Sequence, residues 1–320
     1  MNCKTILPVA AVTPRLSVMS IMAVLVSMGP ASMPAAAADI LVSDGSSGTI
    51  REYTTSGATV NPALISGLSG AGAILVSGSD LFVANYISGV IGEYTTSGGT
   101  VNPALISGLS FPVGGIAQSG SDLFITNYTT GTIGEYTTSG GTVNPALVSG
   151  LTDPSGIVVS GSDLFVENFS IGTIGEYTTS GGTVNPSLFS GLSFPNTMAL
   201  SGSDLFVTSS VSGMIGEYTT SGGTVNPALV SGLGDPIGIA VFGSDLFVNN
   251  NAGDTVGEYT TSGGTVNPAL ISGLTDPDGI AVVAPAVAPE PGTGWMSLAM
   301  LGVLGGLRAA GARRRRMERP

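Results

Sequence analysis

Histidine is absent from this sequence, and cysteine occurs once, at Cys3. The chain therefore has no residues for Cys/His zinc sites, for a histidine-dependent triad, or for a cysteine nucleophile beyond the extreme N-terminus. Basic residues are nearly absent from positions 39–284, which hold Arg51 against 19 acidic residues, a net charge of −18. Such a surface repels phosphate backbones, so we expect no nucleic-acid partner. It attracts cations, so Ca²⁺ is the one cofactor left open and no other is expected.

Between residues 39 and 284 no segment shows helical periodicity over ten residues, and the sequence is instead a repeat. The string Glu-Tyr-Thr-Thr-Ser-Gly occurs six times, at spacings of 41 or 42 residues. One unit holds four short β-branched or aromatic runs, at 156–160, 163–167, 173–178 and 188–190, separated by Gly, Ser, Asn and Pro. Such runs predict strands joined by turns, and four strands in about 41 residues is the size of one propeller blade.

The two ends of the repeat region complement each other. Residues 39–42 match the second strand of a unit, and residues 279–283 match the first. The sequence therefore predicts an all-β, six-bladed β-propeller over 39–284, with four-stranded antiparallel blades, closed where the N-terminal strands pair with the C-terminal strand. An open solenoid is the alternative, but it has no need of complementary ends, whereas a closed ring hides the sheet edges at the join.

The N-terminal segment 1–38 has the features of a signal peptide. Lys4 and Arg15 precede an apolar run, and small residues with Ala36 and Ala38 form an A-x-A cleavage site. A membrane anchor that stays uncut is the alternative, although the apolar run is short for a span.

The C-terminus has three parts in a fixed order. A linker at 285–293 contains Pro289, Glu290 and Pro291, an apolar run at 294–312 predicts a short membrane helix, and 313–320 is a basic tail with Arg313, Arg314, Arg315 and Arg316. The positive-inside rule places that tail in the cytoplasm.

This tripartite order resembles the PEP-CTERM sorting signal of Gram-negative bacteria. The resemblance implies export across the inner membrane and an exosortase partner, which removes the helix and the arginines. The protein would contact the membrane through the helix before processing and end in the cell envelope, at the surface or in the extracellular matrix. A plain tail anchor is the alternative.

The repeat itself resembles NHL and related six-bladed propellers. The residues that carry the resemblance are Asp153-Pro-Ser-Gly-Ile-Val-Val159 followed by Asp163-Leu-Phe-Val166. Relatives of that kind include streptogramin lyases, whose activity depends on histidine, and metal-dependent lactonases. Because near-identical blades supply few unlike residues at one point, we expect a non-catalytic scaffold that binds polysaccharide or protein, and not an enzyme. The alternative is a Ca²⁺-dependent, lactonase-like hydrolase that uses the propeller channel.

Loops after the second strand and before the first vary between units, and the turns of the opposite face are nearly constant. Binding residues concentrate on loops held by a rigid scaffold, so the variable face is the expected ligand face, with neutral drift as the alternative. No catalytic residue is expected. The ligand-binding candidates are Tyr86, Phe111, Tyr128, Phe169, Phe194 and Asn250, and the metal candidates are Glu167, Asn85, Asn127 and Asn168. The asparagines alternatively bond turn backbone, and Glu167 alternatively acts as a general base near the channel mouth.

Overall fold

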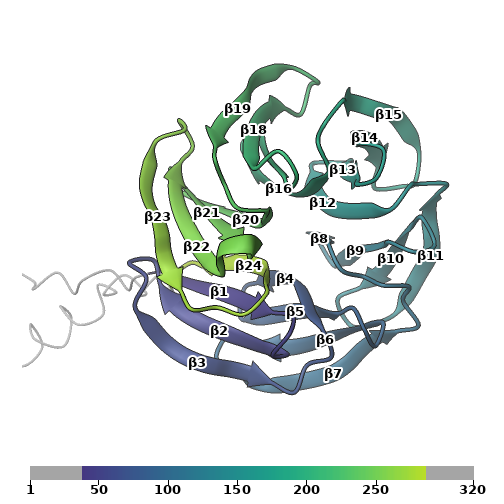
Figure 1. Cartoon of the computed structure of the whole chain (residues 1–320). Coiled ribbons are helices and arrows are strands. Elements are labelled where there is room, and N and C mark those ends of the chain that lie inside the picture. The colour runs from purple at the N-terminus through teal and green to yellow at the C-terminus, as the bar shows by residue number, and fades with distance from the viewer. Residues whose placement is uncertain (1–37, 286–320) are drawn as a thin grey trace, which may run out of the picture. The chain divides into compact units, whose positions relative to one another are not determined.

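The computed structural model describes residues 38–285, which form a closed ring of six four-stranded antiparallel sheets (Figure 1). This confirms the predicted all-β, six-bladed propeller. The predicted signal peptide up to residue 37, the sorting motif, the C-terminal helix and the arginine tail lie outside the described residues. Within 38–285, no helix is long and apolar enough to cross a membrane.

Each blade places its first strand innermost and its fourth outermost. Blade one joins the two ends of the ring: β24 (Pro277–Val283), β1 (Asp39–Asp44), β2 (Thr49–Thr54) and β3 (Thr59–Ser66). Blade two is β4 (Ala71–Ser77), β5 (Asp80–Asn85), β6 (Val90–Thr95) and β7 (Thr100–Ser107). Blade three is β8 (Ile116–Ser119), β9 (Asp122–Asn127), β10 (Thr132–Thr137) and β11 (Thr142–Ser149).

The other three blades repeat this arrangement. Blade four is β12 (Pro154–Ser160), β13 (Asp163–Asn168), β14 (Thr173–Thr178) and β15 (Thr183–Ser190). Blade five is β16 (Pro195–Ser201), β17 (Asp204–Ser209), β18 (Met214–Thr219) and β19 (Thr224–Ser231). Blade six is β20 (Pro236–Phe242), β21 (Asp245–Asn250), β22 (Thr255–Thr260) and β23 (Thr265–Ser272), with the 3₁₀ turn η1 (Asn251–Gly253) after β21.

The ring closes as the sequence predicts. Strand β1 pairs antiparallel with β24, with Asp39 opposite Val283 and Val42 opposite Ile280. The same strand pairs with β2 on its other side, from Asp39 opposite Thr54 to Asp44 opposite Thr49. Three strands from the start of the ring and one from its end therefore make blade one.

Hydrophobic packing between neighbouring blades holds the ring together. The second strand of each unit alternates its side chains between two faces, and both faces are buried. In β5, Leu81 and Val83 pack toward blade one, and Phe82 packs toward blade three. Six such buried clusters occur in the described ring, one between each pair of adjacent blades, including blades six and one.

The outermost strands are longer than the sequence indicates. The fourth strand of blade four runs over Thr183–Ser190 instead of beginning at residue 188, and it includes Pro186. Register shifts between Ile174, Glu176 and Tyr177 show a bulge in its pairing with β14. An outer strand pairs on one side only, so the missing N–H of proline leaves no ladder bond unmade.

Candidate functional site at the channel mouth

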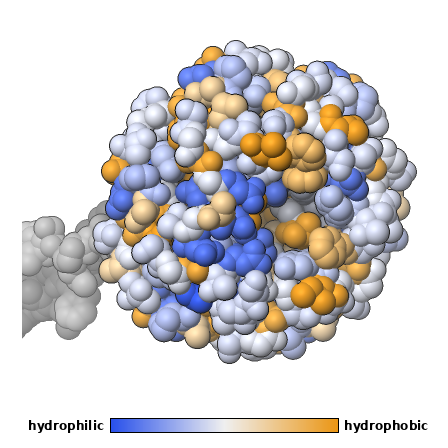
Figure 2. All heavy atoms as spheres, viewed as in Figure 1, coloured by the Kyte–Doolittle hydropathy of each residue, from blue (hydrophilic) through white to orange (hydrophobic). Residues whose placement is uncertain are grey.

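A cavity of about 420 Å³ opens at the centre of the ring, on the face formed by the loops after the second strands and before the first strands. Its lining includes Phe111, Tyr128, Phe169, Asp235 and Asp278. Figure 2 shows the hollow bordered by hydrophilic residues over blades six and one and by hydrophobic residues on the opposite side. The cavity size suits a small molecule or one segment of a polymer.

Five aromatic side chains on the loops of this face form a continuous arc, which we call the aromatic arc: Tyr86, Phe111, Tyr128, Phe169 and Phe194. Phe111, Tyr128 and Phe169 line the cavity, and Tyr86 and Phe194 extend the arc at its two ends. Neighbouring ring centroids lie 5.1, 6.1, 6.4 and 5.1 Å apart in that order. The interplanar angles are near 60°, the edge-to-face geometry that aromatic pairs prefer. Five of the six predicted ligand-binding residues are therefore brought together, from blades two to five.

Two of these aromatic residues, Phe111 and Phe194, have an unfavourable backbone conformation. Phe111 and Phe194 have φ of 56° and 52°, in the left-handed region, and each side chain is 41% exposed. Asp153, Asp235 and Asp276 occupy the equivalent position in three other blades, and aspartate tolerates this conformation better than phenylalanine. Strained, solvent-facing aromatic side chains are found where a binding surface needs them.

Carboxylates form the other side of the mouth. Asp278 lies half-buried in the cavity wall, near Asp276 and Asp44. Burial, with the charges of Asp276 and Asp44, raises the pKa of Asp278 to about 7. Burial also raises the pKa of Asp235. We call Asp235, Asp276 and Asp278 the carboxylate wall.

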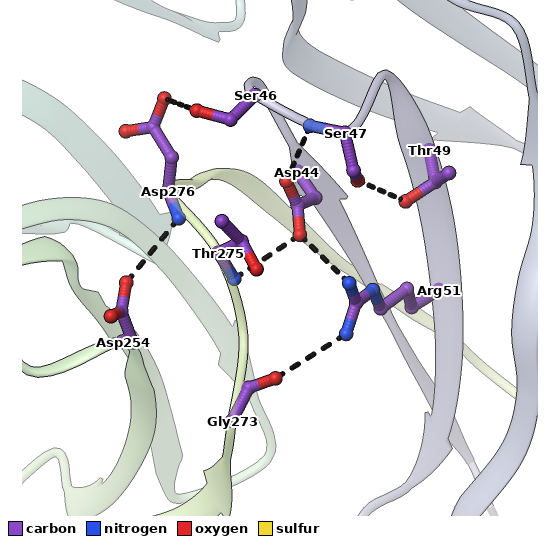
Figure 3. Close-up of polar contacts among 9 residues, drawn as sticks. All are labelled: Asp44, Ser46, Ser47, Thr49, Arg51, Asp254, Gly273, Thr275 and Asp276. Atoms are coloured by element: carbon purple, nitrogen blue, oxygen red, sulfur yellow. Dashed lines mark hydrogen bonds and ion pairs between the residues drawn. The ribbon is translucent and has the colours of Figure 1, made fainter.

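The carboxylates are tied to the ring closure. Asp276 accepts hydrogen bonds from the Ser46 hydroxyl at 2.9 Å and from the Asn251 amide at 2.7 Å. The buried Asp44 forms an ion pair with Arg51 at 3.0 Å and accepts the backbone N–H of Thr275 at 3.2 Å (Figure 3). Arg51 is the only basic residue of the described region, so the other carboxylates have no protein cation beside them.

The asparagine metal candidates are separated, one to a blade. Asn85, Asn127 and Asn168 end β5, β9 and β13, and each side-chain oxygen accepts a backbone N–H from the loop before the first strand of its blade, at 3.0–3.2 Å. Their geometry is that of turn-bonding side chains. Asn250 is also buried, at the end of β21, and its neighbour Asn251 lines the cavity instead. Among residues 38–285, no group of three or more His, Cys, Asp or Glu side chains could hold a metal ion.

Glu167 does not lie at the mouth, where the sequence places it, but is fully buried between blades four and five. Its carboxyl fills the space beside Gly156, against the backbone of Asn196 and Thr197. The same position holds Ser43, Thr126 and Asn249 in other blades, and these side chains donate to carbonyls of the next blade. Side chains at this position therefore bridge neighbouring blades. The residue type of Glu167 alone does not predict that role.

The environment of Glu167 favours its neutral form. Neither carboxyl oxygen makes a hydrogen bond of ordinary geometry. Burial raises the pKa of Glu167 well above its ordinary value, and the nearby Gly156 amide and Ser155 hydroxyl offset this only in part.

Sequence reasoning missed Asp235, Asn251 and Asp278 as cavity residues. Asp278 carried a signal, because it is an acid at the position where the other first strands have Gly72, Ser155, Asn196 or Ile237. Variation between the units marks the loop face as a whole, whereas side-chain type marks only its aromatic residues as binding candidates.

Comparison with known proteins shows the fold but no family. No protein-family model matches the chain, and no curated protein matches it. A chain from the crystal structure of a nidogen–laminin complex superposes with a TM-score of 0.68 at 17% identity, covering 78% of this chain and 100% of that one. Streptogramin B lyase gives 0.59 at 19% identity, covering 78% and 88%. A gluconolactonase from Xanthomonas campestris gives 0.55 at 14% identity, covering 68% and 80%.

These neighbours correct one expectation from the sequence. The similarity of the six blades predicts a protein that is not an enzyme. Streptogramin B lyase and the gluconolactonase share the architecture and are enzymes. The inference from alike blades to absent catalysis is therefore wrong, and the fold alone leaves enzymatic status open.

Proposed function

We propose that this protein is an exported propeller of the cell envelope that binds a polysaccharide or protein through the mouth of its channel. The observation that carries the proposal is the aromatic arc, five side chains in successive contact, three of which line the cavity. Aromatic surfaces are enriched where proteins bind ligands, because they supply large contact area at a small cost in side-chain entropy. The nidogen–laminin chain supports a protein partner only by analogy of fold.

The proposed location in the cell envelope rests on the sequence of the two ends of the chain. The leader at 1–38 and the Pro-Glu-Pro, apolar and arginine segments support export and processing by an exosortase. Before processing, the apolar segment would anchor the protein in the membrane. Intact-mass measurement of protein recovered from the envelope of the producing cells tests this. We expect an N-terminus near Asp39 and loss of Arg313 to Arg316, whereas retained arginines would indicate a plain tail anchor.

Binding is tested with the purified full-length protein on a glycan array and in pull-downs from envelope fractions. We expect one ligand class to be retained by the wild type and lost in Phe194→Asp, which places in blade five the residue that three other blades carry there. Val184→Thr, on the exposed outer strand β15, is the matched control and should bind as the wild type does. Ligands retained equally by Phe194→Asp would contradict binding at the mouth.

Turnover is measured in the same samples, because the fold occurs in enzymes. Lactones and the glycans retained on the array are the substrates to assay. Lactone hydrolysis that is lost on addition of a metal chelator would favour the hydrolase alternative over a binding role alone.

A further inference from the structure

The two sides of the channel mouth differ in chemistry, and together they specify a ligand more narrowly than either does. The aromatic arc occupies blades two to five, and the carboxylate wall lies on blades six and one. Phe169 and Phe111 line the same cavity as Asp235 and Asp278. A ligand that fills the cavity therefore contacts aromatic rings on one side and carboxylates on the other.

The two sides meet at Tyr86. This ring begins the aromatic arc, 5.1 Å from Phe111, and its hydroxyl lies close to the Asp276 and Asp278 carboxyls around Gly45. Burial, together with the charges of Asp278 and Asp276, raises the pKa of Tyr86. A ligand can thus lie against a ring and place a charged group beside a carboxylate within one short span.

The carboxylate wall lacks positive charge. Arg51 is the only basic residue between positions 39 and 284, and it is engaged by Asp44. Burial, with the nearby charges of Asp276 and Asp44, raises the pKa of Asp278. A cation entering the cavity would relieve this excess of negative charge.

The cavity favours an organic cation over a bare metal ion. Metal ions need several oxygen or nitrogen ligands. Residues 38–285 contain no group of three or more His, Cys, Asp or Glu side chains placed to hold a metal ion. Aromatic faces attract ammonium groups through the ring quadrupole, and they also hold apolar ligand surface. A neutral ligand would use the aromatic arc and leave the carboxylates without a partner.

We propose that the channel mouth binds an organic cation, a ligand that joins an apolar face to an ammonium group, with the apolar face on the aromatic arc and the ammonium beside Asp278. This deepens the proposed function and rests on it, since it assigns positive charge to the polysaccharide or peptide segment that the mouth takes. Amine-bearing sugars and lysine-containing segments both carry this chemistry.

The test uses a matched pair of probes, 2-phenylethylammonium and 2-phenylethanol, titrated calorimetrically into the full-length protein. Both present the same phenyl ring, and only the first is charged. At low salt we expect the ammonium compound to bind about tenfold more tightly than the alcohol, from one cation–π contact and one partly screened carboxylate. Added salt should reduce this ratio, because it screens the charge at the open mouth.

Asp278→Asn isolates the charge. The variant should bind the two probes with affinities within about threefold, while its melting temperature equals or exceeds that of the wild type because one like charge is gone. Asp204→Asn, on the constant face, should keep the wild-type ratio. Affinity for the ammonium compound should also rise between pH 6 and pH 8, as Asp278 loses its proton, and this rise should be absent in Asp278→Asn.

Two results overturn the inference. Equal affinities of the probes for the wild type, or no binding of the ammonium compound at about 10 mM, would exclude a cation site of useful strength. An unchanged ratio in Asp278→Asn would place the charge preference elsewhere. If the glycan array or the pull-down still shows a ligand that Phe194→Asp loses, the mouth binds a neutral ligand, and the proposed function survives the failure of the cation inference.

Discussion

Phe194 is the residue at which the site conflicts with local backbone preference. A left-handed backbone costs a non-glycine residue about 1–2 kcal/mol, and the single aromatic contact with Phe169 returns about 0.5–1.5 kcal/mol. We therefore expect Phe194→Asp to change the free energy of unfolding by no more than about 1 kcal/mol while it weakens binding. Urea unfolding measures this. A loss of unfolding free energy well above that figure would show that the Phe194 side chain stabilises the fold and does not serve binding.

Glu167 should make stability depend on pH. Its pKa is raised in the folded protein, so above the ordinary value of 4.5 the unfolded chain ionises first and folding must retain a proton. Stability contributed by this group is therefore present below pH 4.5 and falls as the pH rises toward the folded-state pKa.

Glu167→Gln removes that dependence. We expect the variant to exceed the wild type in free energy of unfolding by about 1–3 kcal/mol at pH 7, the cost of a buried group without a partner, and to match it more closely at pH 4. Chemical unfolding at the two pH values measures the difference. Glu176→Gln, on β14 of the same blade and more exposed, should show no comparable change. Equal stability of wild type and Glu167→Gln at pH 7 would mean that the carboxyl finds partners in solution.

At the scale of elements, β2 differs from the third strands of the other five blades. It has Arg51 where they have Gly92, Gly134, Gly175, Gly216 and Gly257, and β1 ends in Asp44 where four other second strands end in asparagine. The two differences depend on each other, because Arg51 forms an ion pair with the buried Asp44 carboxylate at 3.0 Å. We call this pair the adaptation of blade one.

This adaptation predicts a compensating pair of substitutions. Arg51→Gly should lower the free energy of unfolding by about 2–3 kcal/mol, less than for a fully buried pair because Arg51 is partly exposed. Asp44→Asn combined with Arg51→Gly restores the pattern of the other blades and should recover most of the loss. Thermal melting of the two single variants and the double variant gives the coupling. Additive losses would show that the ion pair is not what holds β1 and β2 here.

Elements could be read from the sequence because the physics that defines them is local and repeated six times. The alternation Leu81-Phe82-Val83, the Gly-Ser turns and the complementary ends determine strands, blade size and closure. The bulge that lets Thr183–Ser190 continue through Pro186 could not be read, because it depends on register against β14. The site was half readable: exposed aromatic residues at loop positions signal a mouth, whereas the burial of Glu167 depends on how blade five packs against blade four.

For the whole molecule, charge is the dominant variable. A net charge of −18 on the ring region means that its carboxylates repel one another, so salt should raise the melting temperature. We expect CaCl₂ and NaCl to raise it equally at equal ionic strength, because no acidic cluster in residues 38–285 forms a metal site. Differential scanning fluorimetry measures both curves. A larger rise with Ca²⁺ would reveal a specific site, and its dependence on Ca²⁺ concentration would give the affinity.

The pairing of β1 with β24 also determines when blade one can fold during synthesis and export of the chain. Blade one cannot form until residues 277–283 have been made, because its innermost strand is nearly the last piece of the ring to be synthesised. Contacts of such sequence separation form slowly, after the loop between them has closed. A chain threading through a membrane pore would therefore remain an open, extendable row of blades, and would lock into a ring only once its far end had crossed.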